Sequence, residues 1–101
     1  MADQPALDPS AARTLSIEIV TPEAMVWEGD AHSVSLPSVS GSMSVRPRHE
    51  PAATVLSEGT VLVRPVGAAP FQVRVAGGYM VVDDDDVSVL VDRATVPEVL
   101  A

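Results

Sequence analysis

The segment FQVRVAGGYMVVDDDDVSVLVDRA, residues 71–94, decides the fold of this chain. Apolar and polar residues alternate before its glycine pair and again after its run of aspartates, which is the period-two pattern of half-buried strands. We therefore expect Arg74 and Ser88 on the outer faces of their strands. The positions expected to point into one core are Phe71, Val73, Val75, Val87, Val89 and Val91.

The rest of the chain repeats this pattern. TLSIEIV (14–20), HSVSLP (32–37) and GTVLVRP (59–65) also alternate, with Val61 facing inward, and AMVWEGD (24–30) is a shorter run that ends at Gly29. Strand signals that recur about every eight to twelve residues, separated by turn residues, indicate an antiparallel sandwich or barrel. No segment shows the apolar stripe of an amphipathic helix. We predict an all-β protein, a single antiparallel β-sandwich of about eight to ten short strands.

Three segments divide the 101 residues. Residues 1–13 contain two prolines and no period, and we expect a flexible N-terminal tail. Residues 14–94 form the sandwich domain. Residues 95–101 form a short C-terminal tail, in which Pro97 and the chain end leave no room for a stable helix.

Composition excludes several classes of function. The net charge is −8, with six arginines and no lysine, so that nucleic acid and direct membrane insertion are poor expectations. There is no cysteine, which excludes a disulfide framework and a thiolate metal site. The N-terminus lacks a secretory signal pattern. We expect a soluble, intracellular protein.

Asp83–Asp86 is the strongest local charge signal. Four carboxylates could bind calcium or magnesium, but a calcium loop places its ligands at alternate positions with a glycine at the bend. Aspartate also favours turns, so we expect a solvated hairpin turn and no metal or other cofactor. The pair Gly77-Gly78 lies between two strand-like runs, where a bulge or a close backbone approach is expected instead of a phosphate loop.

The two histidines invite catalytic interpretations. His49 stands beside Glu50, and such a pair can act as a general base. A hydrolase would also need an activated nucleophile, and no G-x-S-x-G elbow is present. His32 is most simply an exposed residue at a strand end. We expect neither histidine to be catalytic.

The segment GSMSVRPRHEP, residues 41–51, poses the functional question. A catalytic loop, a nucleic-acid arm and a docking loop are the alternatives. Arg46 and Arg48 could form a small anion site, but interface salt bridges are the better expectation in so acidic a chain.

Taken in order, the motifs V-T-P-E, W-E-G-D and A-G-G-Y, followed by V-S-V-L-V-D-R-A, resemble the epsilon subunit of F-type ATP synthases. The resemblance covers the N-terminal β-sandwich domain of that family, from about Leu15 to Ala94. The family's middle loop, roughly G-x-L-G-I-L-P-x-H-x-P, aligns with Gly41–Pro51.

This resemblance implies a non-catalytic rotor part that joins the gamma subunit to the c-ring, peripheral to the cytoplasmic face of the bacterial plasma membrane. The loop would dock on these partners, with its prolines limiting the entropy lost on binding. By resemblance, the partner-interface residues are Gly41, Ser42, Met43, Arg46, Pro47, Arg48 and His49.

Two alternatives to this function stay open, the first because of departures from the family. Ser42, Ser44 and Arg46 differ from the usual residues of the loop, and the family's C-terminal helical hairpin has no counterpart before Ala101. A divergent stand-alone β-sandwich that binds another protein is one alternative. A small hydrolase or metal enzyme that uses His49 with the aspartates is the other, and it has little support.

We predict no saturable binding of calcium, magnesium or ATP at sub-millimolar concentration. The aspartates lack the spacing of cation ligands, and the resemblance assigns nucleotide binding to the hairpin that has no counterpart here. Isothermal titration calorimetry with each ligand should show no stoichiometric heat, and a clear binding isotherm for any of the three would contradict the prediction.

Overall fold

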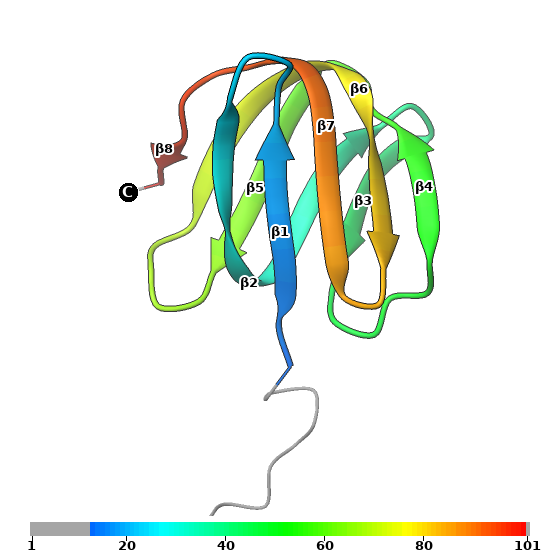
Figure 1. The fold of residues 1–101 in the computed structure, drawn as a ribbon, viewed down its shortest axis with the longest axis vertical. Helices are drawn as coiled ribbons and strands as arrows, with labels where there is room; N and C mark the ends of the chain where they lie inside the picture. The colour runs from blue at the N-terminus through cyan, green and yellow to red at the C-terminus, as the bar shows by residue number, and fades with distance from the viewer. Residues whose placement is uncertain (1–12, 101) are drawn as a thin grey trace, which may run out of the picture.

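A computed structural model describes residues 13–100, which form strands and no helix (Figure 1). Apart from Arg13, the N-terminal tail expected at residues 1–13 lies outside the described residues. The strands are β1 (Leu15–Val20), β2 (Met25–Ser38), β3 (Gly41–Val45), β4 (Ala52–Val55), β5 (Gly59–Pro65), β6 (Phe71–Asp83), β7 (Asp86–Ala94) and β8 (Glu98–Val99).

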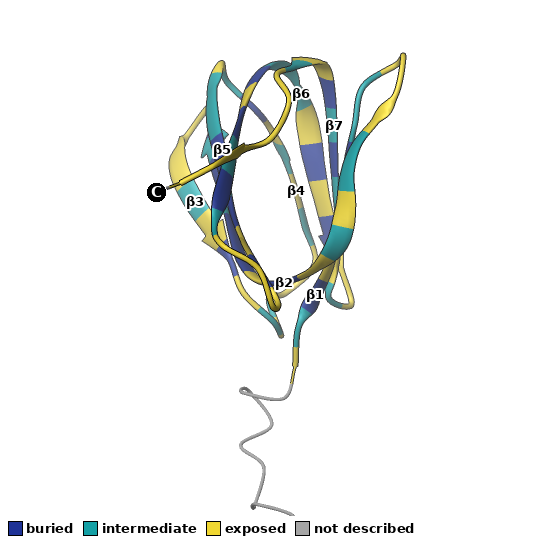
Figure 2. Cartoon of the chain, turned by 90° about the vertical axis from the view of Figure 1, so that its left-hand side faces the viewer, coloured by how far each residue is buried: buried dark blue, intermediate teal, exposed yellow. Residues whose placement is uncertain are grey.

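The strands form two layers that share β2 and β6, as Figure 2 shows from the side. One layer contains β4, the second half of β6, β7, β1 and the first half of β2. The other contains β8, the first half of β6, β5, the second half of β2, and β3. The all-β sandwich predicted from alternation is confirmed. Of the ladders in the described part, β1–β7 alone is parallel.

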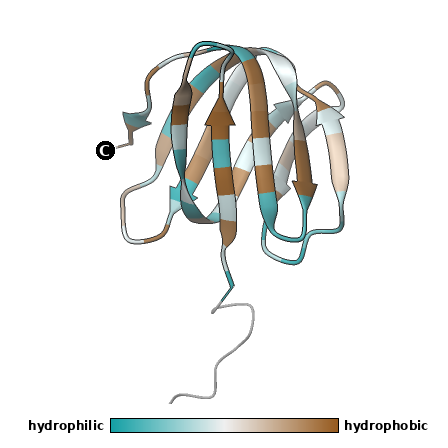
Figure 3. Cartoon of the chain, viewed as in Figure 1, coloured by the Kyte–Doolittle hydropathy of each residue, from teal (hydrophilic) through white to brown (hydrophobic). Residues whose placement is uncertain are grey.

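The core lies between the layers and consists mainly of valine. Figure 3 shows apolar bands alternating with polar ones along β1 and β7. Every core position expected from residues 71–94 is buried, while Arg74 is exposed and Ser88 lies on the outer face, where its hydroxyl donates to Glu18. The largest fully buried side chains are Leu15, Ile17, Ile19, Leu36, Met80, Val34, Val45, Val61, Val63, Val73, Val82 and Val87.

The glycine pair is the corner at which β6 passes from one layer to the other. Val75 is buried, but Tyr79, which would share its face in a regular strand, is exposed, and Met80 is buried instead. Gly77 and Gly78 have φ values of 72° and 127°, which turn the following side chains over. The two runs separated by the glycines are thus one strand with a close backbone approach.

A bulge in β2 makes the opposite corner. His32 is the extra residue between Ala31, which pairs with Pro65, and Ser33, which pairs with Arg64. Ala31 and Val34 both face the core across this bulge. Two expectations were wrong here: the runs around residues 24–37 form one strand, and exposed His32 lies inside it instead of at a strand end.

The aspartate run makes the β6–β7 hairpin turn, as predicted. Asp83 and Asp86 pair, and the two central residues, Asp84 and Asp85, have φ values of 53° and 65°. Positive φ at both central positions is the mark of a type I′ turn, whose twist suits an antiparallel hairpin. Aspartate tolerates this conformation better than most residues with a Cβ atom.

Replacing Gly78 by alanine should destabilise the domain by at least about 2 kcal/mol. An added Cβ would collide with the carbonyl oxygen of Leu90 and lie 2.6 Å from Val91 Cα, at a φ that such residues rarely adopt. Gly67→Ala is the control, because its φ is also positive but nothing lies within 4 Å; we expect about 1 kcal/mol there. Urea unfolding measures both, and equal losses would refute a corner role for Gly78.

Val89→Ala should cost about 1–3 kcal/mol, since it removes two buried methyl groups and leaves part of a cavity. Val55→Ala, at a side chain that is 58% exposed, should change the stability by less than about 0.5 kcal/mol. Thermal and urea unfolding of the two variants provide the measurement. A loss within error of zero for Val89→Ala would contradict the strand register.

Candidate functional site

The segment 41–51 is partly strand and partly loop. Gly41–Val45 forms β3 and pairs with β2, which corrects the expectation of a loop throughout. Residues 46–51 form the connection to β4, at the end of the sandwich that also holds the β6–β7 turn and the start of β1 (Figure 1). The fold therefore brings Arg13, the segment 46–51 and the aspartate turn together.

The predicted interface residues lie mostly at the surface. Met43 packs partly against the core opposite Leu36, so its side chain is the least available of the β3 residues in the set. Pro47 and His49 are half-buried. The exposed members are Gly41, Ser42, Arg46 and Arg48.

Arg46–His49 forms a tight turn. The His49 backbone N–H donates to the carbonyl oxygen of Arg46 at 3.2 Å. Pro47 occupies the second position, where its fixed φ fits, and Arg48 the third, with φ at 69°. This is the pattern of a type II turn, which normally requires glycine or asparagine at the third position. An arginine there is held in an unfavourable backbone conformation.

Asp85 contacts two of the segments that meet at this end. Its Oδ1 accepts a hydrogen bond from the backbone N–H of Arg48 at 2.7 Å, and its Oδ2 lies 3.0 Å from Nη2 of Arg13. The bond from Arg48 is the main cause that lowers the pKa of Asp85 below its ordinary value, against a smaller rise from burial. The guanidinium of Arg13 adds to the lowering.

The catalytic and metal alternatives gain no support from this arrangement. His49 Nδ1 lies 2.7 Å from the carbonyl oxygen of Glu50, a contact with the next residue in the chain. Within residues 13–100, no three histidine, aspartate or glutamate side chains converge well enough to hold a metal ion. The described part also contains no helix long and apolar enough to span a membrane.

A row of apolar side chains lies on the outer face of the β4–β6–β7–β1 layer. Its members pair directly across neighbouring strands, in the order Val55, Tyr79, Leu90 and Val20. Tyr79 is 50% exposed, and Val81, also exposed, lies one step along β6 opposite Ala53. Tyr79, Leu90 and Val20 line a hollow of about 330 Å³. We call Val55, Tyr79, Leu90 and Val20 the outer apolar row.

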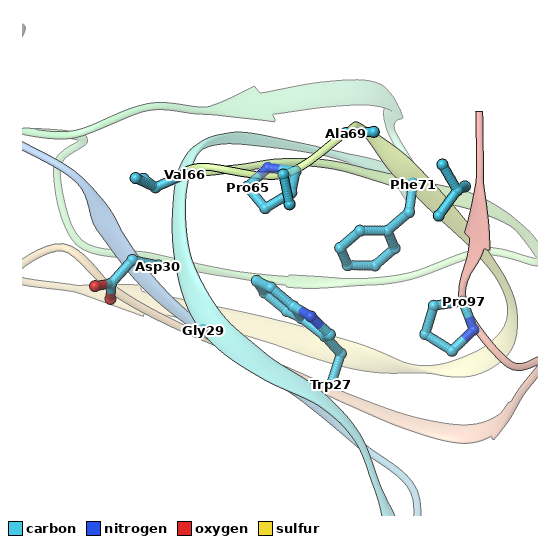
Figure 4. Close-up of a pocket in the computed structure, with 10 residues that line it drawn as sticks. Trp27, Gly29, Asp30, Pro65, Val66, Ala69, Phe71 and Pro97 are labelled. Carbon is cyan, nitrogen blue, oxygen red and sulfur yellow. The ribbon is translucent and has the colours of Figure 1, made fainter. Parts of the chain in front are cut away.

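A second apolar hollow of about 530 Å³ lies where β2, the β5–β6 connection and the C-terminal segment meet (Figure 4). Trp27 and Phe71 form its floor, with ring centroids 4.9 Å apart and an interplanar angle of 59°. Pro65, Pro97 and Val99 are among the residues that surround them. Such a tilted aromatic pair stabilises the end of the core.

Sequence reasoning missed the outer apolar row and the bond from Arg48 to Asp85. Continuing the alternation of residues 71–75 through the glycine pair would have buried Tyr79, whereas aligning Met80 and Val82 with the valines of β7 would have exposed it. The Arg48–Asp85 bond joins residues 37 positions apart. No local signal marks it, because proline followed by arginine does not predict a type II turn.

Comparison with known proteins agrees with this architecture. Residues 14–97 match the family model described as ATP synthase, Delta/Epsilon chain, beta-sandwich domain. The ATP synthase epsilon chain of Gloeothece citriformis is 38% identical over 81 residues, which are 80% of this chain and 58% of the relative. That of Halalkalibacterium halodurans is 37% identical over 84 residues, which are 83% and 62% of the two chains. The chain thus spans less than two thirds of the length of these relatives.

Solved structures share the fold. A chain in the OSCP/F1/c-ring structure of Euglena gracilis mitochondrial ATP synthase superposes with a TM-score of 0.77 at 18% identity, over 95% of this chain and 59% of that one. A chain in the central stalk/c-ring structure from Tetrahymena thermophila gives 0.70 at 14%, over 83% and 67%. The chain described here belongs to the family of the ATP synthase delta/epsilon β-sandwich domain.

Proposed function

We propose that this chain is a non-catalytic central-stalk subunit of a proton-translocating F-type ATP synthase, which couples the gamma subunit to the c-ring during ATP synthesis. Membership of the delta/epsilon family supports this role, as does the naming of similar chains as ATP synthase epsilon chains. Such a subunit would be peripheral to the membrane, held at the cytoplasmic face of the bacterial plasma membrane through its partners.

The observation that carries the proposal is the outer apolar row. The solvent face of an antiparallel sheet normally carries polar residues, yet here Val55, Tyr79, Leu90 and Val20 lie side by side across four strands. Contiguous exposed apolar residues mark interaction sites on soluble proteins. A half-exposed tyrosine beside a hollow is also the residue type that dominates the binding energy of protein interfaces. We assign this face to the gamma subunit.

The segment 41–49 supplies a second, separate surface. It lies on β3 and at the end of the sandwich, while the row lies on the outer face of the other layer. Two surfaces in different directions allow one small domain to contact two partners at once, as coupling requires. We assign this second surface to the c-ring and the neighbouring stalk. Its contact residues are Gly41, Ser42, Met43, Arg46, Pro47, Arg48 and His49.

The interaction of the loop with its partner should depend on salt. Arg46 and Arg48 are exposed, and exposed ion pairs weaken as ionic strength rises. A stand-alone interaction module of the same fold is the second candidate, and the unusual Arg46 and Ser44 favour it. Co-purification with gamma distinguishes the two candidates, because a stand-alone module would not copurify with it.

Tyr79→Ala should weaken co-purification of the chain with gamma, and His49→Ala its co-purification with the c-ring, of the same ATP synthase. Both changes remove partly exposed side chains, so the free energy of unfolding of the isolated domain should change by no more than about 0.5 kcal/mol. The melting temperature should therefore stay close to that of the native chain. Val66→Ala is the matched control: Val66 is 45% exposed but lies beside the Trp27–Phe71 hollow, away from both surfaces.

Tyr79→Ala should reduce retention of gamma specifically, and His49→Ala retention of the c-ring, with Val66→Ala like the native chain. A variant that melts early yet assembles normally would show that its residue is structural. Native co-purification that all three substitutions leave intact would place the interface elsewhere.

A further inference from the structure

Each acceptor oxygen of Asp85 accepts a hydrogen bond from a different residue. Its carbonyl oxygen accepts from the backbone N–H of Ser16 at 2.9 Å. Its Oδ2 is held by Arg13, with Nη2 at 3.0 Å and Nε at 3.3 Å. These contacts orient the carboxylate so that Oδ1 meets the backbone N–H of Arg48 at 2.7 Å.

The group that Asp85 contacts is the peptide that defines the turn type. Type I and type II turns share their end residues and differ by a flip of the central peptide, here the bond between Pro47 and Arg48. Proline suits the second position of both types, so Pro47 does not choose between them. Arginine at the third position favours type I, because type II requires the φ of 69° that it adopts here.

The bond to Asp85 therefore opposes the local preference of the turn. A hydrogen bond to a charged acceptor is stronger than one between neutral groups, and the length of 2.7 Å fits that class. The carboxylate itself is fixed from the other side, by Arg13 and through the strand β1. A rigid hairpin turn thus imposes one peptide orientation on a loop whose own sequence prefers the other.

We propose that Asp85 is a positioning residue: by binding the Arg48 N–H it holds the Pro47–Arg48 peptide in the type II orientation and so presents the loop 46–49 to its partner in one conformation. The consequence for docking rests on the proposed function. A loop that is already in its binding conformation loses less entropy on association. Flipping the peptide would reverse the Pro47 carbonyl and redirect the Arg48 side chain.

The substitutions that test this are compatible with the hairpin turn. Asp85→Gly removes the carboxylate but accepts the positive φ. Asp85→Asn keeps an acceptor oxygen and also tolerates this φ. Asp84→Gly, in the same turn, is the matched control for the lost charge and the added glycine. Arg48→Gly, alone and combined with Asp85→Gly, removes the local preference against type II.

Two measurements on the full chain test separately the conformation of the turn and its effect on binding. In NMR spectra, the cross-peak between Pro47 Hα and the Arg48 amide proton is strong in a type II turn and weak in type I. We expect Asp85→Gly to reduce it to the weak intensity of a type I turn and to accelerate exchange of the Arg48 amide about tenfold or more. Asp85→Asn and Asp84→Gly should keep the cross-peak. In the Arg48→Gly background, adding Asp85→Gly should leave it intact.

The second measurement is the dissociation constant for the gamma–c-ring subcomplex of the same synthase. Asp85→Gly should weaken binding about fivefold or more in the native background, and by less than about twofold in the Arg48→Gly background, where the turn is type II without the carboxylate. Asp85→Asn should restore most of the loss, and Asp84→Gly should bind like the native chain.

Each contrary result has its own meaning. An unchanged cross-peak in Asp85→Gly would overturn the positioning role outright. A flipped turn with unchanged binding would overturn its importance for docking, while leaving the gamma and c-ring proposal in place. A native chain that fails to bind the subcomplex would overturn the proposed function and the docking consequence together, and the NMR result would then describe the turn alone. Equal losses in both backgrounds would also refute the inference.

Discussion

The contact on which the rest of the structure depends is the close approach of the Gly78 backbone to Leu90 and Val91. There β6 leaves one layer, enters the other and exchanges its inner and outer faces. A Cβ atom at this point would separate β6 from β7, the strand with which it shares most of its length. The same reversal buries Met80 and Val82 in the core and leaves Tyr79 and Val81 outside. One backbone constraint thus produces both the closed core and the apolar outer row.

The sequence alone predicted the strands, the valine core and the aspartate turn, because alternation and turn chemistry are local properties. It did not predict where the alternation reverses. In β6 the reversal depends on the positive φ of Gly77 and Gly78, and in β2 on the bulge at His32. The run YMVV after the glycines is apolar throughout, so it does not show which of its residues face the core. The interface residues came from resemblance, and the fold has placed them on β3 and a tight turn without testing their role. The role of Asp85 could not be predicted, because only its hydrogen bond with Arg48, which is distant in sequence, distinguishes it from the three neighbouring aspartates.

The charged residues near the loop 46–49 are arranged so that positive charge is exposed there, despite the acidic excess of the chain. Asp85 forms an ion pair with Arg13 and accepts a hydrogen bond from the backbone N–H of Arg48. The Arg46 side chain is exposed at the surface. An exposed arginine at the start of a turn can form rim contacts with a partner even on a chain of net charge −8. The strained turn and the acidic hairpin are therefore parts of one arrangement, in which the half-buried Asp85 carboxylate holds the backbone and the exposed Arg46 guanidinium lies at the surface.

The parallel ladder between β1 and β7 has a consequence for how the chain folds. β1 pairs with β2 nearby in sequence, but its other edge has to wait for residues 86–90, which are about seventy positions later. Here the connection between the two parallel strands includes most of the domain, and contacts of this separation slow folding because the loop must close before they form. During synthesis, Leu15, Ile17 and Ile19 remain incompletely covered until β7 has left the ribosome. The first strand made is thus among the last to be secured, and the sheet closes only when nearly the whole domain exists.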